Sequence, residues 1–394
     1  MKLLIVNSHL ETGGIRQSLL NLISNISDLD IDIDLQLLKY DPSALKDESL
    51  KTVSLCPPIR VLNAYNTPFT KQNNNMDRII KSFFWMISKV FGKRFTMGML
   101  MKFVPKSKKY DIAISFSNDI WAAHVGGFNG GCNDYVLKRV DANKKIGWVH
   151  NDPHRLGFTK QICTDTYKEF QLIVNVSNAC KDMFDFIIPE YTQKSKVVYN
   201  MLDIDRISML SQNGNPFDKS NFHIVTVARL DNQQKCIDRI IYCCEKLKKE
   251  GFKNFKWHII GDGPDKDLLN TLSKERGTQD VIIFEGQKDN PFPYMKYADV
   301  FVLVSDYEAF GMVVMESLSL GTPVICTNYP ASQELIVKEG NGIITDISVE
   351  GIFSAVSRVI KNPEILKKMR DYISMNSINN EISLKQFKEV ISGE

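Results

Sequence analysis

The sequence predicts an α/β protein built from two doubly wound parallel sheets. Short apolar runs of strand length alternate with amphipathic stretches of helical length along most of the chain. The chain has 394 residues, which suits two such domains. Loop-type sequence at Gln212–Pro216 separates the two series of elements, so we expect the boundary between residues 200 and 221.

In the N-terminal half, a buried-type strand at Leu3–Val6 is followed by Gly13 and Gly14 and then by a helix. Residues 28–38 alternate aliphatic side chains with aspartates and Gln36, which predicts a strand with one exposed face. Further strands are predicted at residues 110–115, 145–149, 172–176 and 196–199, with a helix beginning near Ser177.

In the C-terminal half, the alternation is more regular. Strands are predicted at residues 224–227, 257–260, 281–284, 300–304 and 324–327. Helices are predicted at about 236–250, after the turn Gly261–Pro264, around Tyr294 and at about 311–320. The first of these helices has an apolar stripe that should be buried, formed by Ile237, Ile240, Ile241, Cys244 and Leu247.

Composition excludes several classes of protein. The net charge of +3 is too small for the whole chain to bind nucleic acid as a polycation. The 8 cysteines form no zinc-type ladder with histidine, so we expect free thiols in a reducing cytosol and no metal site. No apolar run has the length of a signal peptide or a membrane helix. We expect a cytoplasmic protein whose membrane contact, if any, is peripheral, at the inner face of the cell membrane.

Ligands of doubly wound sheets bind at the carboxyl ends of the strands, so the residues that follow each strand are candidates. Arg229 follows the strand at 224–227, and Lys235 lies where the next helix is predicted to begin. Two cations beside a helix N-terminus would suit a phosphate. Two solvated surface cations are an equally good interpretation of this spacing.

After the strand at 300–304, Phe310 and Gly311 lie where the next helix begins, and its backbone N–H groups could bind a phosphate. Glu308 and Glu316 would face the same edge of the sheet, and a carboxylate can accept two hydrogen bonds from a vicinal diol. The pattern by itself favours ordinary surface glutamates.

The combination of these motifs resembles glycosyltransferase family 4, whose members are retaining nucleotide-sugar transferases with the GT-B fold. The pair Glu308 and Glu316 matches the family's two glutamates, and residues 317–325 continue the match. Arg229 and Lys235, the turn Gly261–Pro264 and the glycine pair near residue 13 match as well. Ala309 departs from the family's usual glycine. The resemblance covers about the whole chain.

The resemblance implies a role for each candidate. Arg229 and Lys235 should neutralise the donor's diphosphate, Glu316 should hold the ribose, and Glu308 should contact the donor sugar. His150 should face the reacting centre, binding either donor or acceptor; from the residues alone it reads as a core or surface histidine. We therefore predict His150, Glu308, Arg229 and Lys235 as the catalytic set. The predicted donor-binding set is Gly13, Gly14, Arg229, Lys235, Gly261, Phe284, Gln287, Glu308, Phe310, Gly311 and Glu316.

The resemblance also implies the domain roles. Residues 1–200 should form an acceptor-side domain joined by a C-terminal helix at about 380–394, and residues 201–379 should bind the nucleotide-sugar. The implied reaction moves a hexose-type sugar, with UDP favoured over GDP, to a saccharide or lipid-linked saccharide in bacterial surface-polysaccharide (capsule-type) synthesis. No metal or other cofactor should be required. A sugar-nucleotide epimerase of the same fold and a non-catalytic sugar-nucleotide-binding subunit remain alternatives.

Two other motifs are interpreted as structural. The aspartates of residues 28–34 match the D-x-D pattern of metal-dependent transferases, but their alternation with aliphatic residues favours a strand face. Gly261 and Gly263 form only half of a dinucleotide fingerprint.

Residues 76–110 form a basic block, in which nine lysines and arginines stand against Asp77, for a net charge of +8. Bulky apolar residues lie between the charges, which favours contact with an anionic membrane surface over a helical cover on the core. Nucleic acid is disfavoured, because the rest of the chain has no matching basic patch.

Overall fold

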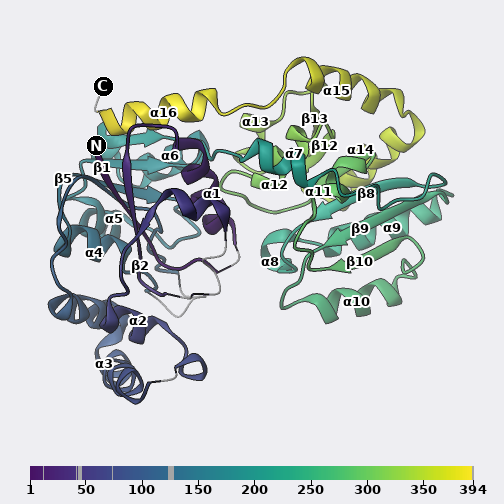
Figure 1. Ribbon diagram of the computed structural model, residues 1–394. Coiled ribbons are helices and arrows are strands. Elements are labelled where there is room, and N and C mark those ends of the chain that lie inside the picture. The colour runs from purple at the N-terminus through teal and green to yellow at the C-terminus, as the bar shows by residue number, and fades with distance from the viewer. Residues whose placement is uncertain (12, 41, 43–46, 73, 123–127, 393–394) are drawn as a thin grey trace. The chain divides into compact units, whose positions relative to one another are not determined.

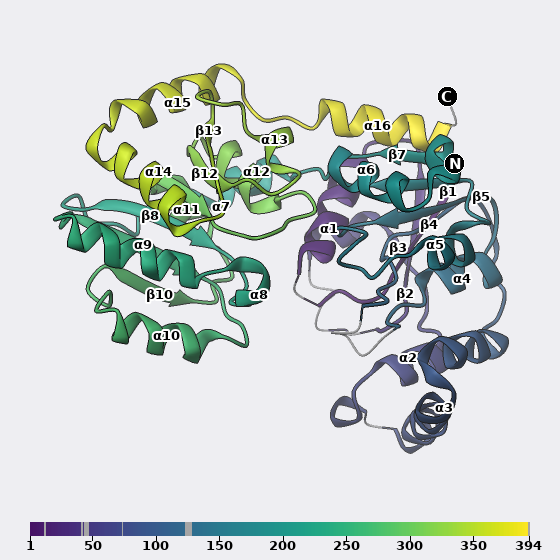
Figure 2. The same cartoon turned by 180° about the vertical axis from the view of Figure 1, so that it is seen from behind.

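The structure is a computed structural model that describes residues 1–11, 13–40, 42, 47–72, 74–122 and 128–392. The chain divides into two compact units, which we call unit 1 (Met1–Met201 with Glu381–Glu394) and unit 2 (Leu202–Asn380). Each unit contains one parallel sheet against which helices pack, as Figures 1 and 2 show from opposite sides. The predicted fold class, two doubly wound α/β domains, is confirmed.

The sheet of unit 1 has the strand order β3-β2-β1-β4-β5-β6-β7 in its described residues, with parallel neighbours throughout. The order reverses between β1 and β4, which is the place where doubly wound sheets bind ligands at their carboxyl ends. The strands are β1 (Lys2–Asn7), β2 (Asp32–Leu37), β3 (Ser54–Leu55), β4 (Lys109–Ser115), β5 (Asp141–Val149), β6 (Leu172–Asn175) and β7 (Ser195–Val197).

Apart from α16, which follows unit 2 in the chain, the helices of unit 1 lie between successive strands of its sheet. The α-helices are α1 (Gly14–Ile26), α2 (Arg60–Asn66), α3 (Asn75–Leu100), α4 (Cys132–Arg139), α5 (Lys160–Tyr167), α6 (Asn178–Ile187) and α16 (Glu381–Ser392). Short 3₁₀ helices are η2 (Glu48–Thr52), η3 (Phe69–Lys71), η4 (Met101–Phe103) and η6 (Pro189–Lys194). Ser177 caps α6 by accepting a hydrogen bond from the backbone N–H of Cys180 (3.1 Å), which agrees with the predicted start of this helix.

The predicted exposed face of the second strand is confirmed at Asp30 and Asp32, which are exposed, and is wrong at Asp34 and Gln36. Asp34 and Gln36 are buried in β2, because this strand lies inside the sheet between β3 and β1. The Asp34 carboxylate accepts a hydrogen bond from the Tyr110 hydroxyl (2.6 Å) and pairs with Lys108 (2.7 Å). A buried carboxylate needs such partners, so the aspartate alternation belongs to the packing of the sheet.

The C-terminal helix α16 completes unit 1. Phe387 is fully buried and its ring lies 6.5 Å from that of Trp148 on β5. Lys144 on β5 donates to the Val390 carbonyl (2.7 Å), and the Tyr199 N–H donates to Gln386 Oε1 (3.0 Å). Helix α16 therefore packs as part of unit 1, together with the N-terminal half of the chain.

The sheet of unit 2 has the order β10-β9-β8-β11-β12-β13 in its described residues, again with parallel neighbours. Its strand order reverses between β8 and β11. The strands are β8 (Phe222–Val227), β9 (Phe255–Ile260), β10 (Ile282–Gly286), β11 (Val300–Leu303), β12 (Val324–Thr327) and β13 (Gly342–Thr345).

The helices of unit 2 are α7 (Ile204–Leu210), α8 (Asn232–Lys235), α9 (Asp238–Lys249), α10 (Lys266–Glu275), α11 (Phe292–Tyr297), α12 (Met312–Ser319), α13 (Ser332–Leu335), α14 (Val349–Lys361) and α15 (Glu364–Met375). All five residues of the apolar stripe predicted around Ile240 are fully buried in the core, so this prediction is confirmed.

The helix predicted at about 236–250 is confirmed as α9, which begins at Asp238 and ends at Lys249. Cys236 has a left-handed backbone (φ 50°) and separates the short α8 from α9. Lys235 is therefore the last residue of α8, and the prediction that it starts a helix is wrong. A non-glycine residue in this conformation is uncommon and gives no signal in a hydrophobic pattern.

The basic block contains one long helix with a break. In α3, Gly92 has φ 82°, which a glycine adopts readily, and the helix changes direction there. In the part of the chain that the structure describes, no helix combines the length and the apolar character needed to cross a bilayer.

Candidate functional site

The carboxyl ends of β8 and β11 bring the two halves of the predicted donor site together in unit 2. These strands are hydrogen-bonded neighbours where the strand order reverses. The loops that follow them are tied to each other: the Asp306 N–H donates to the Gln234 carbonyl (2.8 Å), and the Gln234 side chain donates to the Tyr307 carbonyl (3.2 Å). Arg239 donates to the Val304 carbonyl (3.1 Å) and pairs with Asp306 (3.2 Å).

Lys235 and Glu308 meet across this junction. Lys235 Nζ lies 2.5 Å from Glu308 Oε1, and the Ser305 hydroxyl donates to the same oxygen (2.7 Å). The Lys235 and Glu308 side chains are only 16% and 12% exposed. A charge pair with so little exposure is held in place by its surroundings, and it presents a cation and an acceptor together at the edge of the sheet.

Arg229 is more exposed than Lys235 and has a different carboxylate partner. Its side chain is 63% exposed and pairs with Asp231 two residues later. Lys235 pairs instead with Glu308. The structure thus gives the two predicted phosphate ligands separate carboxylate partners.

Gly311 and Glu316 lie on the element that follows Glu308. Gly311 precedes α12 with φ 100°, and a Cβ at this position would lie 2.5 Å from the Tyr329 hydroxyl, so only glycine fits. Glu316 is 8% exposed, and burial raises the pKa of its carboxyl to about 7. This carboxyl is therefore poised to change its charge near neutral pH.

The glycine-rich turn is a packing device. A Cβ on Gly261 would lie 1.9 Å from the Ala228 carbonyl oxygen, and one on Gly263 would lie 2.4 Å from that of Leu230. The Leu230 N–H donates to the Asp262 carbonyl (3.0 Å) in the same contact. The turn lets the loop after β9 approach the loop after β8, and so it supports the segment that carries Arg229.

Phe284 and Gln287 belong to the end of β10. Phe284 is half-buried and packs against the core of unit 2, whereas Gln287 follows the strand and is exposed. Between them, Glu285 accepts from Tyr294 (3.2 Å) and pairs with His258 Nδ1 (3.0 Å).

In unit 1, Gly13 precedes α1 and Gly14 is its first residue, and a Cβ on either would meet no described atom within 4 Å. His150 directly follows β5 and is buried, and its backbone N–H donates to Asn118 Oδ1 (2.9 Å). Burial lowers the pKa of His150 to about 3, so the imidazole is neutral at physiological pH. Its Nε2 atom is buried and has no hydrogen-bond partner among the described residues.

Sequence reasoning missed three residues of these sites: Ser305, Asn118 and Tyr329. Ser305 and Asn118 each lie two or three residues beyond a strand, so their position at the carboxyl end of a sheet could have identified them. Tyr329 gives no such signal, because only the fold brings its buried hydroxyl against Gly311.

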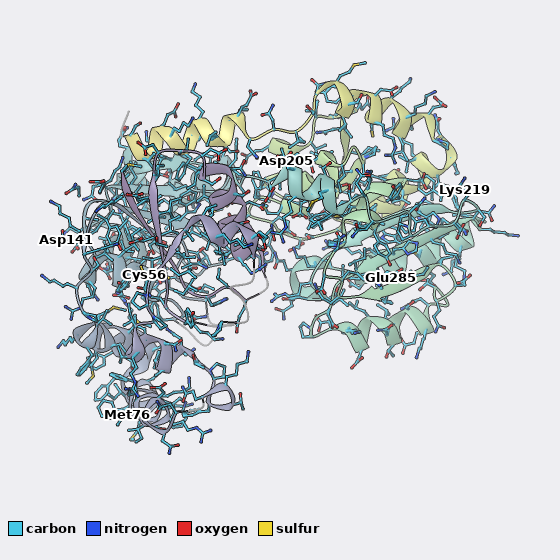
Figure 3. The ribbon with its side chains drawn as sticks, in the orientation of Figure 1. Cys56, Met76, Asp141, Asp205, Lys219 and Glu285 are labelled. Atoms are coloured by element: carbon cyan, nitrogen blue, oxygen red, sulfur yellow. The ribbon has the colours of Figure 1, made fainter. Side chains whose placement is uncertain are left out.

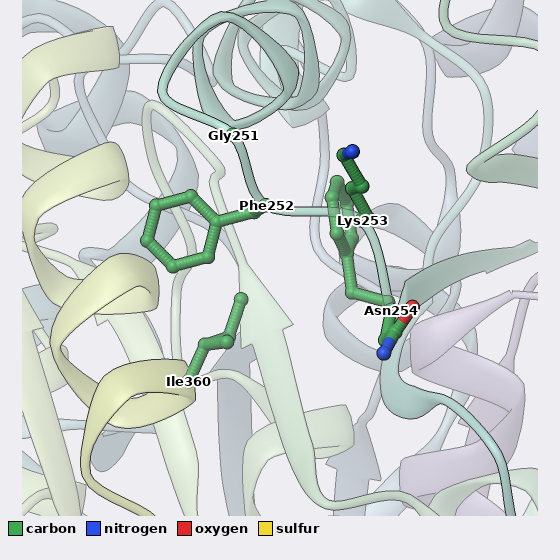
Figure 4. Close-up of a pocket in the computed structure, with 6 residues that line it drawn as sticks. Gly251, Phe252, Lys253, Asn254 and Ile360 are labelled. Atoms are coloured by element: carbon green, nitrogen blue, oxygen red, sulfur yellow. The ribbon is translucent and has the colours of Figure 1, made fainter.

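Other features do not compete with this site. No group of three or more His, Cys, Asp or Glu in the described ranges is arranged to hold a metal ion. A pocket of about 400 Å³ lies at the start of β9, lined by Gly251, Phe252, Lys253, Asn254, Phe255 and Ile360 (Figure 4). It lies at the amino end of the strand, away from the end where ligands of such sheets bind.

Comparison with known proteins identifies the family. Residues 210–376 match the family described as glycosyl transferases group 1. An uncharacterized glycosyltransferase of Methanocaldococcus jannaschii, MJ1607, is 30% identical over 277 residues, which cover 62% of this chain and 68% of that protein. The N-acetylgalactosamine-N,N'-diacetylbacillosaminyl-diphospho-undecaprenol 4-alpha-N-acetylgalactosaminyltransferase of Campylobacter jejuni is 26% identical over 181 residues, covering 45% of this chain and 48% of that enzyme. The chain spans only part of other relatives as well: the match covers 50% of M. jannaschii MJ1059 and 34% of Rhizobium meliloti LpsE.

Solved structures agree with the fold. Anabaena HepE in complex with UDP and glucose superposes with a TM-score of 0.70 at 16% identity, covering 100% of both chains. WaaG, a glycosyltransferase involved in lipopolysaccharide biosynthesis, superposes with a TM-score of 0.61 at 13% identity and the same coverage. The chain therefore belongs to the group 1 glycosyl transferases, and its two parallel-sheet units have the GT-B fold.

Proposed function

We propose that this chain is a retaining glycosyltransferase that moves a hexose-type sugar from a nucleotide-sugar, UDP-linked rather than GDP-linked, to a saccharide acceptor in bacterial surface-polysaccharide synthesis. The observation that carries the proposal is the Lys235–Glu308 pair at the junction of β8 and β11. The UDP in the HepE structure supports the choice of nucleotide. Relatives named for lipopolysaccharide core and O-antigen biosynthesis support the pathway class.

The donor's parts have chemically suited partners in unit 2. Arg229 and Lys235 neutralise the diphosphate, assisted by the backbone N–H groups at the start of α12 near Phe310 and Gly311. Glu316 accepts hydrogen bonds from the ribose, and Glu308 from the donor sugar. The base lies against Phe284 and Gln287. Lys235 and Glu308 lie in contact, so the proposed phosphate ligand and the proposed sugar ligand are neighbours.

In unit 1, Gly13, Gly14 and His150 are proposed as further ligand-binding residues. Gly13 and Gly14 leave open space in which a ligand can approach the backbone. His150 is neutral, so it acts through hydrogen bonding at Nε2 and carries no charge at neutral pH.

The proposed chemistry follows the family's retaining route. The bond between the anomeric carbon and the β-phosphate oxygen breaks, and the acceptor hydroxyl adds to the same face of the sugar. The acceptor's proton passes to the leaving phosphate, so no protein nucleophile is needed. Arg229 and Lys235 stabilise the charge that grows on the nucleoside diphosphate, which is electrostatic catalysis without an obligatory metal.

The acceptor is proposed to be lipid-linked. The diphospho-undecaprenol in the name of the C. jejuni relative supports a saccharide carried on a lipid diphosphate. The two alternatives, an epimerase and a non-catalytic subunit, have no comparable support among the relatives.

Incubation of the full chain with a panel of UDP- and GDP-sugars tests the proposal. We expect nucleotide release and free or transferred sugar with one UDP-sugar, retained anomeric configuration by NMR, and no loss of activity with EDTA. Interconversion of two nucleotide-sugars would support the epimerase, and binding without turnover would support the subunit. Abolition by EDTA with rescue by manganese would contradict the metal-free route. Extracted bacterial lipid fractions, compared with short soluble saccharides, then test the acceptor.

A further inference from the structure

The first half of α3 carries a stripe of apolar side chains that the fold of unit 1 does not cover. Its members recur at intervals of three and four residues, which places them on one face of the helix. They are between 49% and 70% exposed: Met76, Ile79, Phe83, Met86 and Val90. We call these five residues the α3 stripe. In Figure 3, Met76 lies at the lower end of unit 1, below Cys56.

The stripe is additional to the face that α3 uses for packing. Phe84 is buried in the core of unit 1, and Ile80 and Ile87 pack partly buried against the same core. These three residues lie on the adjacent face of the helix and account for its attachment to α2 and the sheet. An ordinary helical cover would have a polar outer face, so the core does not explain the α3 stripe.

Positive charge borders the stripe. Lys89 follows Met86 by three residues, is exposed, and lies 5.3 Å from the ring of Trp85. Lys93 and Lys102 are also exposed, and Lys102 adjoins Phe103, whose ring lies 5.9 Å from that of Phe84. Residues 76–110 carry a net charge of +8. Apolar side chains bordered by cations are the chemistry that an anionic lipid surface recognises.

We propose that the α3 stripe and its bordering cations dock unit 1 onto an anionic lipid bilayer. The same heptad-like spacing could also pair two helices of two copies. Charge favours the bilayer, because pairing two copies through α3 would bring together the exposed Lys89 and Lys93 of both copies. This proposal rests on α3 alone and stands whether or not the chain transfers sugar.

Flotation of the full chain with vesicles tests the proposal. We expect binding to phosphatidylglycerol vesicles, little binding to phosphatidylcholine vesicles, and weaker binding as potassium chloride is raised. The double variant Phe83→Ser/Val90→Ser should reduce partitioning into phosphatidylglycerol vesicles by ~10-fold or more. Its control is Phe186→Ser/Ile382→Ser, which removes a phenylalanine and a β-branched aliphatic residue from exposed positions on α6 and α16 of the same unit and should bind like wild type.

A charge variant tests the contribution of the cations that border the α3 stripe. Lys89→Glu/Lys93→Glu/Lys102→Glu should also reduce partitioning by ~10-fold or more. The control Lys219→Glu/Lys253→Glu/Lys274→Glu makes the same change of net charge in unit 2, outside the surface, and should bind nearly as well as wild type. Arg94 is left unchanged, because it pairs with the buried Asp134 and its loss would disturb the fold. Circular dichroism before flotation confirms that each variant is folded.

Equal flotation of wild type and the stripe variant would overturn the proposal, as would the absence of binding to phosphatidylglycerol. Sedimentation without lipid decides about a second copy. A dimer that strengthens with salt and disappears in Phe83→Ser/Val90→Ser would show that the chain itself covers the α3 stripe. Because donor turnover is not a readout here, failure of this experiment leaves the proposed transfer reaction untouched.

Discussion

At the scale of single residues, Lys235 is the most informative side chain of the candidate site. Its ammonium group is mostly buried and lies 2.5 Å from Glu308. If it stabilises the leaving diphosphate, Lys235→Ala should lower kcat by ~10²-fold or more, the usual effect of losing one preorganised electrostatic contact. The control Lys246→Ala removes a lysine that pairs with Glu350 on the surface of unit 2 and should leave kcat unchanged. Steady-state kinetics with the active donor measures both, and a change of less than ~2-fold in Lys235→Ala would exclude this role.

The two glutamates should differ in what they bind. Glu316→Ala should weaken the binding of bare UDP, because its proposed partner is the ribose. Glu308→Ala should leave UDP binding nearly intact and weaken binding of the complete UDP-sugar. Isothermal titration calorimetry with both ligands measures the difference. An equal loss of UDP affinity in the two variants would show that Glu308 does not act on the sugar.

The buried carboxyl of Glu316 predicts proton release on binding. Burial raises its pKa to about 7 from the ordinary 4.5, so the free protein holds this proton at pH 6. Ribose hydroxyls that donate to the carboxylate favour the charged form, so UDP should displace the proton between pH 5 and 7. Calorimetry in two buffers of different ionisation enthalpy should detect up to one proton released, and Glu316→Gln should release none.

The raised pKa of Glu316 also affects the stability of the fold. Between pH 4.5 and 7 the folded state holds a proton on Glu316 that the unfolded state has lost. The free energy of unfolding should therefore fall as pH rises through this window, and Glu316→Gln should remove that part of the fall. Urea titrations at several pH values would report it, and an identical pH profile in wild type and variant would contradict the burial argument.

At the scale of elements, the turn after β9 depends on one glycine. Gly261 has φ 144° and its Cα faces the Ala228 carbonyl, so Gly261→Ala meets both strain and a backbone clash. The control Gly277→Ala has φ 62° and open space, so it should cost only ~1 kcal/mol. Gly261→Ala should lower the free energy of unfolding by at least ~2 kcal/mol more. Trp257, fully buried on β9, reports the unfolding of unit 2 by its fluorescence.

Helices and strands were predictable where the spacing of their apolar residues matches the period of a helix or a strand. The strand at 324–327 and the buried stripe around Ile240 are as predicted, because apolar period alone determines them. The break at Cys236 was not predictable, since a left-handed residue leaves the apolar pattern unchanged. Nor was the burial of Asp34, which depends on contacts from Tyr110 on β4 and from Lys108 just before that strand.

The candidate site shows the same limit. The motifs identify Lys235 and Glu308, which lie 73 residues apart, but only the strand order brings them into contact. For the α3 stripe, the spacing of the apolar residues can be read from the sequence, but the exposure of their side chains depends on the fold. Periodicity alone cannot tell a face that packs on the core from one that faces out, because both are apolar.

At the scale of the whole molecule, α16 ties the end of the chain to unit 1. Phe387 is fully buried near Trp148, so Phe387→Ala should lower the free energy of unfolding of unit 1 by about 3 kcal/mol or more. Ile382→Ala is the matched control on the same helix, because Ile382 is 65% exposed and should contribute little.

Fluorescence in a Trp257→Phe background isolates unit 1, since Trp85, Trp121 and Trp148 all belong to it. In the Trp257-containing protein, the transition of unit 2 should keep its midpoint in Phe387→Ala, because each unit has its own core. A loss confined to unit 1 would establish α16 as part of that domain. If instead the two transitions shifted together, the units would unfold as one cooperative body, and the stability of the sheet of unit 2 would depend on a helix that packs in unit 1.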